Sequence, residues 1–296
     1  MSTSLMTTFM LSSGQGEQVN LLALLIAVAI SVSTAAVSGV FVPRRILGPA
    51  RLSPGEPRRI LLGITGFGLA AWSGTVFVVM AWQGNAGAQS RPVTAPPQFT
   101  DVQMVVIDAV TKAAVLAAML GASIALRPAG LRMLGINPAR FPGGLAGGIL
   151  GIIIVLPLIT VVDAVTEWWW KYEKLDHPAA HETLLILQRH PEKWLHVMIV
   201  VSAGLLAPLA EELFFRGYVQ TFLRYAFKRP WLAVLVTAEL FALVHPTWMR
   251  PQILFLGICL GYVYERTGNL WVCIVMHALF NCASIAFFWH SQMGRG

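Results

Sequence analysis

The stretch that decides the fold is LHVMIVVSAGLLAPLAEELFFRGYVQTFLRY, which spans Leu195–Tyr225. It is apolar along most of its length, and its acidic and basic side chains are Glu211, Glu212, Arg216 and Arg224. About 20 consecutive apolar residues are enough for an α-helix to cross a lipid bilayer. We therefore expect one long membrane helix that continues to Tyr225 and contains Gly217, so that Glu211 lies near its middle.

The rest of the chain also has the composition of a membrane protein. Of its 296 residues, 56% are hydrophobic and 12% are charged, whereas soluble domains have about 25% charged residues. Further apolar blocks lie at Val19–Val42, Ile60–Trp82, Met104–Leu126, Gly143–Val165, Trp231–Trp248, Gln252–Tyr264 and Leu270–Trp289. We expect an all-α fold, a polytopic membrane bundle of about eight transmembrane helices.

The chain divides into three parts. Residues 1–194 hold the first membrane helices and end in a loop, Thr166–Trp194, that begins with the aromatic cluster Trp168–Trp170. Tryptophan is enriched at the membrane surface, so this cluster predicts an interfacial anchor. Residues 195–290 hold most of the ionisable side chains that fall inside apolar blocks, and residues 291–296 form a C-terminal tail.

Basic residues predict how the chain is oriented. They gather in Pro43–Arg59, Arg127–Phe141 and Arg216–Pro230, which fall on one side if every block spans the membrane. Loops rich in lysine and arginine face the cytoplasm, so this side should be cytoplasmic. Anionic lipid headgroups account for the formal net charge of +7, and we expect no nucleic-acid partner. In the loop before Leu195, His181–His190 predicts a short amphipathic surface helix.

The first polar motif is Glu211-Glu212-x-x-x-Arg216. Glu212 and Arg216 are four residues apart and share one face of a helix, where they can form an ion pair. Glu211 is rotated from Glu212 by about 100°, so it points elsewhere and lacks that partner. A carboxylate placed in this way is a candidate general base. The alternative is a charged patch at the interfacial end of a helix.

Two further motifs pair a histidine with a residue one helical turn away. Phe241-x-x-x-His245 is followed by Pro246, which should free backbone carbonyls near the histidine. His277-x-x-x-Asn281 places two hydrogen-bond donors on one face of an apolar block, an arrangement that suits an oxyanion. Taken singly, these motifs are better explained by a structural histidine and by a hydrogen-bonded pair between helices.

Other polar residues in the apolar blocks have simpler explanations. Asp108 and Lys112 are four residues apart and should neutralise each other. Asp163 and Glu239 stand alone, the first at the interface and the second in a structural role or beside a site. The cysteines have the spacing of neither a zinc site nor a disulfide framework, and we expect them to pack against lipid or protein: Cys259, Cys273 and Cys282.

Together, the three motifs resemble the CAAX-protease and bacteriocin-processing family, which includes the type II prenyl endopeptidases called Rce1-like. The resemblance covers about residues 195–290, and all three motifs match at their defining positions. It implies a helical intramembrane endopeptidase, a hydrolase that acts on a peptide or membrane protein, with or without an attached lipid. It also implies the cytoplasmic membrane of a bacterium as the location.

The resemblance also implies a role for each motif residue. Glu211 and His245 would activate a water molecule, and His277 and Asn281 would bind the oxyanion of the tetrahedral intermediate. Three residues would support the site structurally: Glu212, Arg216 and Phe241.

Three other interpretations remain open. In a metal-dependent version of the same protease, Glu211, His245 and His277 would bind zinc with an open fourth position. We expect catalysis without a metal or other cofactor, because an asparagine beside His277 suits an oxyanion site better than a ligand set. A non-enzymatic membrane scaffold or bacteriocin-immunity protein would use the same residues for packing, and a transporter would use them to relay protons.

Overall fold

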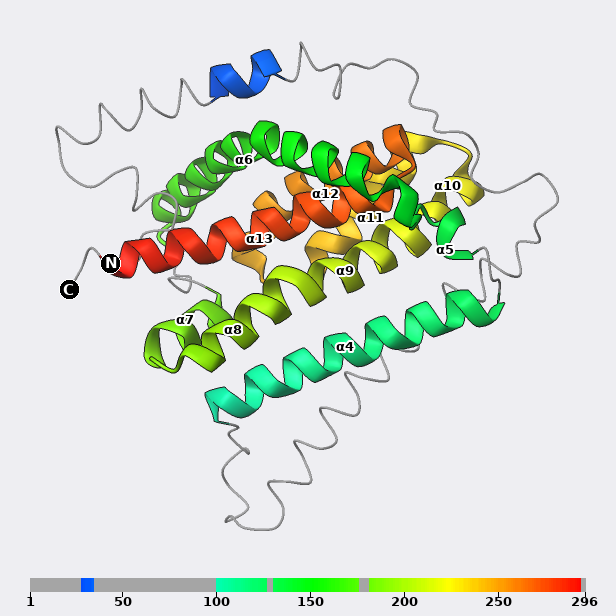
Figure 1. Cartoon of the computed structure of the whole chain (residues 1–296). Coiled ribbons are helices and arrows are strands. Elements are labelled where there is room, and N and C mark those ends of the chain that lie inside the picture. Colours follow the sequence, from blue (N-terminus) through cyan, green and yellow to red (C-terminus); the bar gives the residue numbers. More distant parts are fainter. Residues whose placement is uncertain (1–27, 35–99, 127–129, 176–180, 294–296) are drawn as a thin grey trace, which may run out of the picture.

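The computed structural model describes residues 28–34, 100–126, 130–175 and 181–293, and every regular element in these ranges is a helix (Figure 1). The all-α fold is therefore confirmed. After a helix at 28–34, the α-helices are α4 (Asp101–Leu126), α5 (Gly130–Met133), α6 (Phe141–Tyr172), α7 (Glu182–Arg189), α8 (Lys193–Val201), α9 (Ala207–Glu212), α10 (Thr221–Phe227), α11 (Pro230–Leu243), α12 (Arg250–Thr267) and α13 (Leu270–Met293). Short 3₁₀ and π segments complete the series: η1 (Pro138–Arg140), η2 (Ser202–Leu206), η3 (Leu213–Gln220) and η4 (Thr247–Met249).

The described part of the chain forms a polytopic membrane bundle, as expected. Four segments are long and apolar enough to cross a bilayer: Asp101–Ile124, Pro138–Tyr172, Lys193–Phe227 and Leu270–His290. Helix α11 is apolar but shorter. The block predicted at Ile60–Trp82 lies outside the described residues, as does Val19–Val42 apart from 28–34.

The long helix predicted at Leu195–Tyr225 is confirmed, and it runs from Lys193 to Phe227. It is not a uniform α-helix, because the π-helical segments η2 and η3 lie on either side of α9. In η2 the Ala207 N–H donates to Ser202 O, five residues back. Each π turn holds more residues than an α turn, so η2 changes the direction in which the following residues point.

Helix α13 is held close to α6, and the two lie side by side in Figure 1. Glycine makes this approach possible: a Cβ atom at Gly148 would lie 2.6 Å from the Val275 Cβ atom. Small residues let membrane helices pack with their backbones near each other. The contact fixes the helix that carries His277 and Asn281.

One boundary differs from the sequence-based prediction. Helix α6 continues to Tyr172, so the aromatic cluster Trp168–Trp170 lies in its last turns and not at the start of a loop. The Trp168 and Tyr172 rings, four residues apart, stack at 5.6 Å, which favours a continued helix. A short helix is present in the predicted segment His181–His190 as α7, and Leu187 on its apolar side is buried.

Candidate active site

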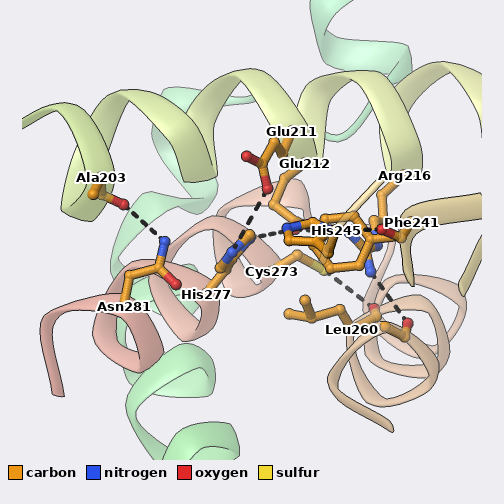
Figure 2. A network of polar contacts seen from close by, with 11 residues as sticks. Ala203, Glu211, Glu212, Arg216, Phe241, His245, Leu260, Cys273, His277 and Asn281 are labelled. Carbon is orange, nitrogen blue, oxygen red and sulfur yellow. Dashed lines mark hydrogen bonds and ion pairs between the residues drawn. The ribbon is translucent and has the colours of Figure 1, made fainter. Parts of the chain in front are cut away.

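The motif residues come from three helical segments that meet inside the bundle (Figure 2). Glu211 and Glu212 end α9, and His277 and Asn281 lie on α13. Helix α11 ends just before His245 because the residue after this histidine is Pro246, which has no backbone N–H and disfavours helix in the residue before it. His245 therefore lies in the turn that follows α11.

The predicted Glu212–Arg216 ion pair is confirmed. Arg216 Nη1 lies 2.8 Å from Glu212 Oε1, and both side chains are 0% exposed. Arg216 Nη2 also donates to the Gly257 carbonyl at 3.2 Å, which ties this pair to α12. Because both charges are buried, each depends on these contacts, which therefore define the geometry of the site closely.

Glu212 also holds His277, a contact that the sequence did not reveal. His277 Nδ1 lies 2.8 Å from the same Glu212 Oε1 atom, and the two residues are 65 positions apart. Because a carboxylate accepts hydrogen bonds, Nδ1 is the protonated nitrogen and Nε2 faces the other side of the ring. Glu212 thus fixes both the orientation and the tautomer of His277.

Glu211 faces that other side of the ring. Its Oε2 atom lies 3.8 Å from His277 Nε2, and its side chain is 15% exposed. The prediction that Glu211 points away from Arg216 holds, and the contact described for Glu211 is with His277. A separation of 3.8 Å is too long for a strong direct hydrogen bond, and it allows one water molecule to contact both atoms.

His245 is oriented by the end of its own helix. Its Nδ1 atom donates to the Phe241 carbonyl at 2.7 Å, and its ring packs on the Phe241 ring with 4.8 Å between centroids. The Nε2 atom is then the unprotonated nitrogen of the neutral ring. Among the described contacts, no hydrogen bond or ion pair joins His245 to Glu211, and the role of this proposed pair stays a prediction.

Phe241 packs at the centre of the site and is 0% exposed. Its ring lies 5.7 Å from the His277 ring, and the Arg216 guanidinium lies 4.6 Å from its centroid. Its own carbonyl holds His245. One buried aromatic residue therefore contacts both histidines and the buried cation.

Asn281 donates to a backbone carbonyl and shares no acceptor with His277 in this structure. Its Nδ2 atom lies 2.7 Å from Ala203 O, in η2. This carbonyl lacks a helical donor: the Ala207 N–H bonds to Ser202, and residue 208 is a proline without an N–H. Pro208 in the sequence signals a carbonyl without a helical donor at this point. It does not predict that Asn281 binds this carbonyl.

Of the two residues expected to stand alone, one has a clear partner. Gln252 Nε2 donates to Asp163 Oδ1 at 2.6 Å, so the prediction of an isolated Asp163 was wrong. The interaction joins α6 to α12, and residue spacing cannot predict a contact between residues so distant in sequence. Glu239 is exposed on α11. Asp108 and Lys112 form the predicted ion pair, at 2.6 Å.

Within the described ranges, no three histidine, cysteine, aspartate or glutamate side chains are grouped so that they could hold a metal ion. Glu211, His245 and His277 are all within these ranges, and they do not form a ligand set in this arrangement. The zinc alternative is tested by peptide cleavage with and without a metal chelator.

Residues 193–283 match the family described as type II CAAX prenyl endopeptidase Rce1-like. This region contains all three polar motifs, and the match confirms the resemblance that those motifs indicate. At the level of the family, it supports a membrane protease of the CAAX type. No curated protein and no solved structure is significantly similar to the chain.

Proposed function

We propose that this protein is an intramembrane endopeptidase in which the Glu211 carboxylate activates a water molecule for attack on a peptide bond. The observation that carries the proposal is the position of Glu211, 3.8 Å from the Nε2 atom of a histidine that a buried ion pair holds in place. General-base catalysis requires a proton acceptor near a second polar group at the reacting atoms. The family match over residues 193–283 supports the same chemistry.

In the proposed reaction, Glu211 takes a proton from water while the water oxygen bonds to the carbonyl carbon. The electron pair of the C=O double bond moves to the carbonyl oxygen and forms an oxyanion. His245 is the second group that accepts from the water, because its Nδ1–H is engaged by Phe241 and its Nε2 lone pair is not. The C–N bond then breaks, and the leaving nitrogen takes the proton from Glu211.

His277 and Asn281 stabilise the oxyanion in this proposal. His277 Nδ1 already donates to Glu212, so Nε2 donates to an oxyanion when the ring carries both protons. Asn281 has two N–H groups and uses one of them on Ala203, so the second can serve the substrate. Glu212, Arg216 and Phe241 act as positioning residues.

The membrane helices around the site and the family match indicate which kind of substrate and which location to propose. Helices that can cross a membrane support a bilayer as one partner, and the family match supports a peptide as the other. We propose that the peptide belongs to a membrane-bound or lipidated protein, because such a substrate can reach a site among membrane helices. The bacterial cytoplasmic membrane, with the basic loops inside, is the proposed location.

The test is peptide cleavage by the purified protein in detergent, comparing wild type with Glu211→Gln. Lipidated and unlipidated peptides serve as substrates, with and without a metal chelator. The substitution removes the general base and keeps the side-chain shape, so we expect kcat/KM to fall by about 100-fold or more. Glu239→Gln makes the same change at an exposed carboxylate on α11 and should cleave like wild type.

Each outcome separates one interpretation from the others. Equal cleavage by wild type and Glu211→Gln contradicts the assignment of Glu211. Loss of wild-type cleavage in the chelator, with recovery on addition of zinc, favours the metal-dependent alternative. If the folded wild-type protein cleaves none of the peptides, the proposed activity fails for those substrates and the scaffold interpretation gains support.

A further inference from the structure

A second polar cluster lies outside the active site, where α4 meets the long helix. Asp108 Oδ2 accepts hydrogen bonds from Lys112 Nζ and from Ser202 Oγ, each at 2.6 Å. Lys112 Nζ also lies 3.5 Å from the Ser202 hydroxyl. Ser202 is only 2% exposed, and it begins the π-helical segment η2. The cluster therefore attaches α4 to the start of the π-helical turn.

The residue after Ser202 is the one that holds Asn281. Ala203 O receives the Asn281 Nδ2 hydrogen bond at 2.7 Å because the helix itself supplies no donor at this position. Consecutive residues of η2 are thus bonded to different neighbours, Ser202 to α4 and Ala203 to α13. Figure 1 shows the long helix between these two neighbours, and both are in contact with it.

We propose that Ser202 and Asp108 are positioning residues for the active site, which hold the π-helical turn so that Ala203 directs Asn281 toward the substrate carbonyl. This inference rests on the proposed function, in which Asn281 stabilises the oxyanion. Lys112 neutralises Asp108 but contributes less to positioning the turn, because Ser202 donates to Asp108 directly. Displacement of an oxyanion donor by a small distance lowers the reaction rate, because oxyanion stabilisation depends on fixed geometry.

The chain contains a matched control for this contact. Ser123 also lies on α4, is fully buried, and hydrogen-bonds with Tyr218 in η3 of the same long helix. Ser123→Ala and Ser202→Ala therefore each remove one hydroxyl from the seam between α4 and the long helix. Only Ser202 adjoins the carbonyl that holds Asn281, so the two variants separate positioning from simple loss of packing.

The first measurement is the rate of peptide cleavage. We expect Ser202→Ala to lower kcat by about 5- to 20-fold with KM nearly unchanged, and Ser123→Ala to leave kcat within about twofold. Asp108→Ala should resemble Ser202→Ala. Because Ser202 acts through Asn281, adding Ser202→Ala to Asn281→Ala should cause little further loss.

The second measurement needs no protease activity. Cys282 follows Asn281, is exposed, and lies against the turn: a Cβ atom at Gly204 would be 2.9 Å from its Sγ atom. The rate at which maleimide labels Cys282, read by mass spectrometry at that residue, therefore reports the contact between η2 and α13. Labelling should be faster in Ser202→Ala than in wild type or Ser123→Ala.

Two results would overturn the inference. The first is that Ser202→Ala matches Ser123→Ala in both cleavage and labelling. The second is that the effects of Ser202→Ala and Asn281→Ala on kcat multiply as independent effects do. Failure of the proposed function is recognised separately, because it requires Glu211→Gln to cleave like wild type, whereas Cys282 labelling does not depend on catalysis.

Discussion

Two ion pairs of this protein have the same spacing in the sequence and different surroundings in the structure. Glu212–Arg216 and Asp108–Lys112 each join a carboxylate to a cation four residues later, at 2.8 Å and 2.6 Å. The side chains of the first pair are 0% exposed, whereas Asp108 is 43% and Lys112 22% exposed. Spacing predicted both pairs, but burial decides what each contributes to the fold.

The buried pair has little freedom to rearrange. Glu212 Oε1 already accepts from Arg216 and His277, and Glu212 Oε2 is buried without a described hydrogen-bond partner. Removing one member leaves an uncompensated charge in an apolar region, whereas the Asp108–Lys112 pair is partly exposed and Asp108 keeps a second partner in Ser202. The two pairs should therefore respond very differently to the same substitution.

The largest expected effect is that of Arg216→Met. This change leaves the Glu212 carboxylate buried without its cation, and the free energy of unfolding should fall by about 3–5 kcal/mol. Thermal and denaturant unfolding of the detergent-solubilised protein would measure it. The double variant Glu212→Gln with Arg216→Met removes both charges and should be more stable than Arg216→Met alone. If Arg216→Met were as stable as wild type, the two ion pairs would not differ in their contribution to stability.

Glu212→Gln should have an intermediate effect on stability. The charge that complements Arg216 and His277 is lost, but the glutamine oxygen can still accept a hydrogen bond. Arg216 also keeps the Gly257 carbonyl and the Phe241 ring, so its charge is less isolated than that of Glu212 in Arg216→Met. We expect a decrease of about 1–2 kcal/mol in stability, with a fall in kcat because His277 is less firmly oriented. Asp108→Asn makes the same chemical change in the exposed pair. If both variants lose equal stability, burial does not distinguish the pairs.

The smallest expected effect is that of Lys112→Met. Methionine keeps the apolar stem, and Asp108 remains bonded to Ser202. The free energy of unfolding should change by no more than about 1 kcal/mol. Unfolding curves recorded beside those of Arg216→Met test this prediction directly, and a loss as large as that of Arg216→Met would contradict it.

Local spacing and hydropathy predicted the parts of the site that depend on one helix. The long helix and the Glu212–Arg216 pair follow from apolar length and from a separation of four residues. The Glu212–His277 contact depends instead on how two helices are rotated against each other, and helical periodicity carries no information on that rotation. The same holds for the hydrogen bond between Asp163 and Gln252.

The His245 environment was partly predictable. A proline at 246 indicated freed carbonyls, and the Phe241 carbonyl is indeed bound by the imidazole of His245 and not by its backbone N–H. The predicted block Trp231–Trp248 is not one continuous helix, because α11 ends at Leu243 and His245 lies in the turn that follows. The π-helical segments were not predicted, since their amino-acid composition is that of the α-helix around them.

The π-helical turn also determines the direction in which Glu211 points. An i→i+5 hydrogen bond encloses one residue more than the bond of an α-helix. If the same residues of Ser202–Leu206 were wound as an α turn, Glu211 would be rotated by about 100° relative to α8. The polar motifs would remain intact in such a chain, yet Glu211 would no longer face His277. A one-residue deletion in this segment would therefore keep Glu211 in place only if the turn became α-helical.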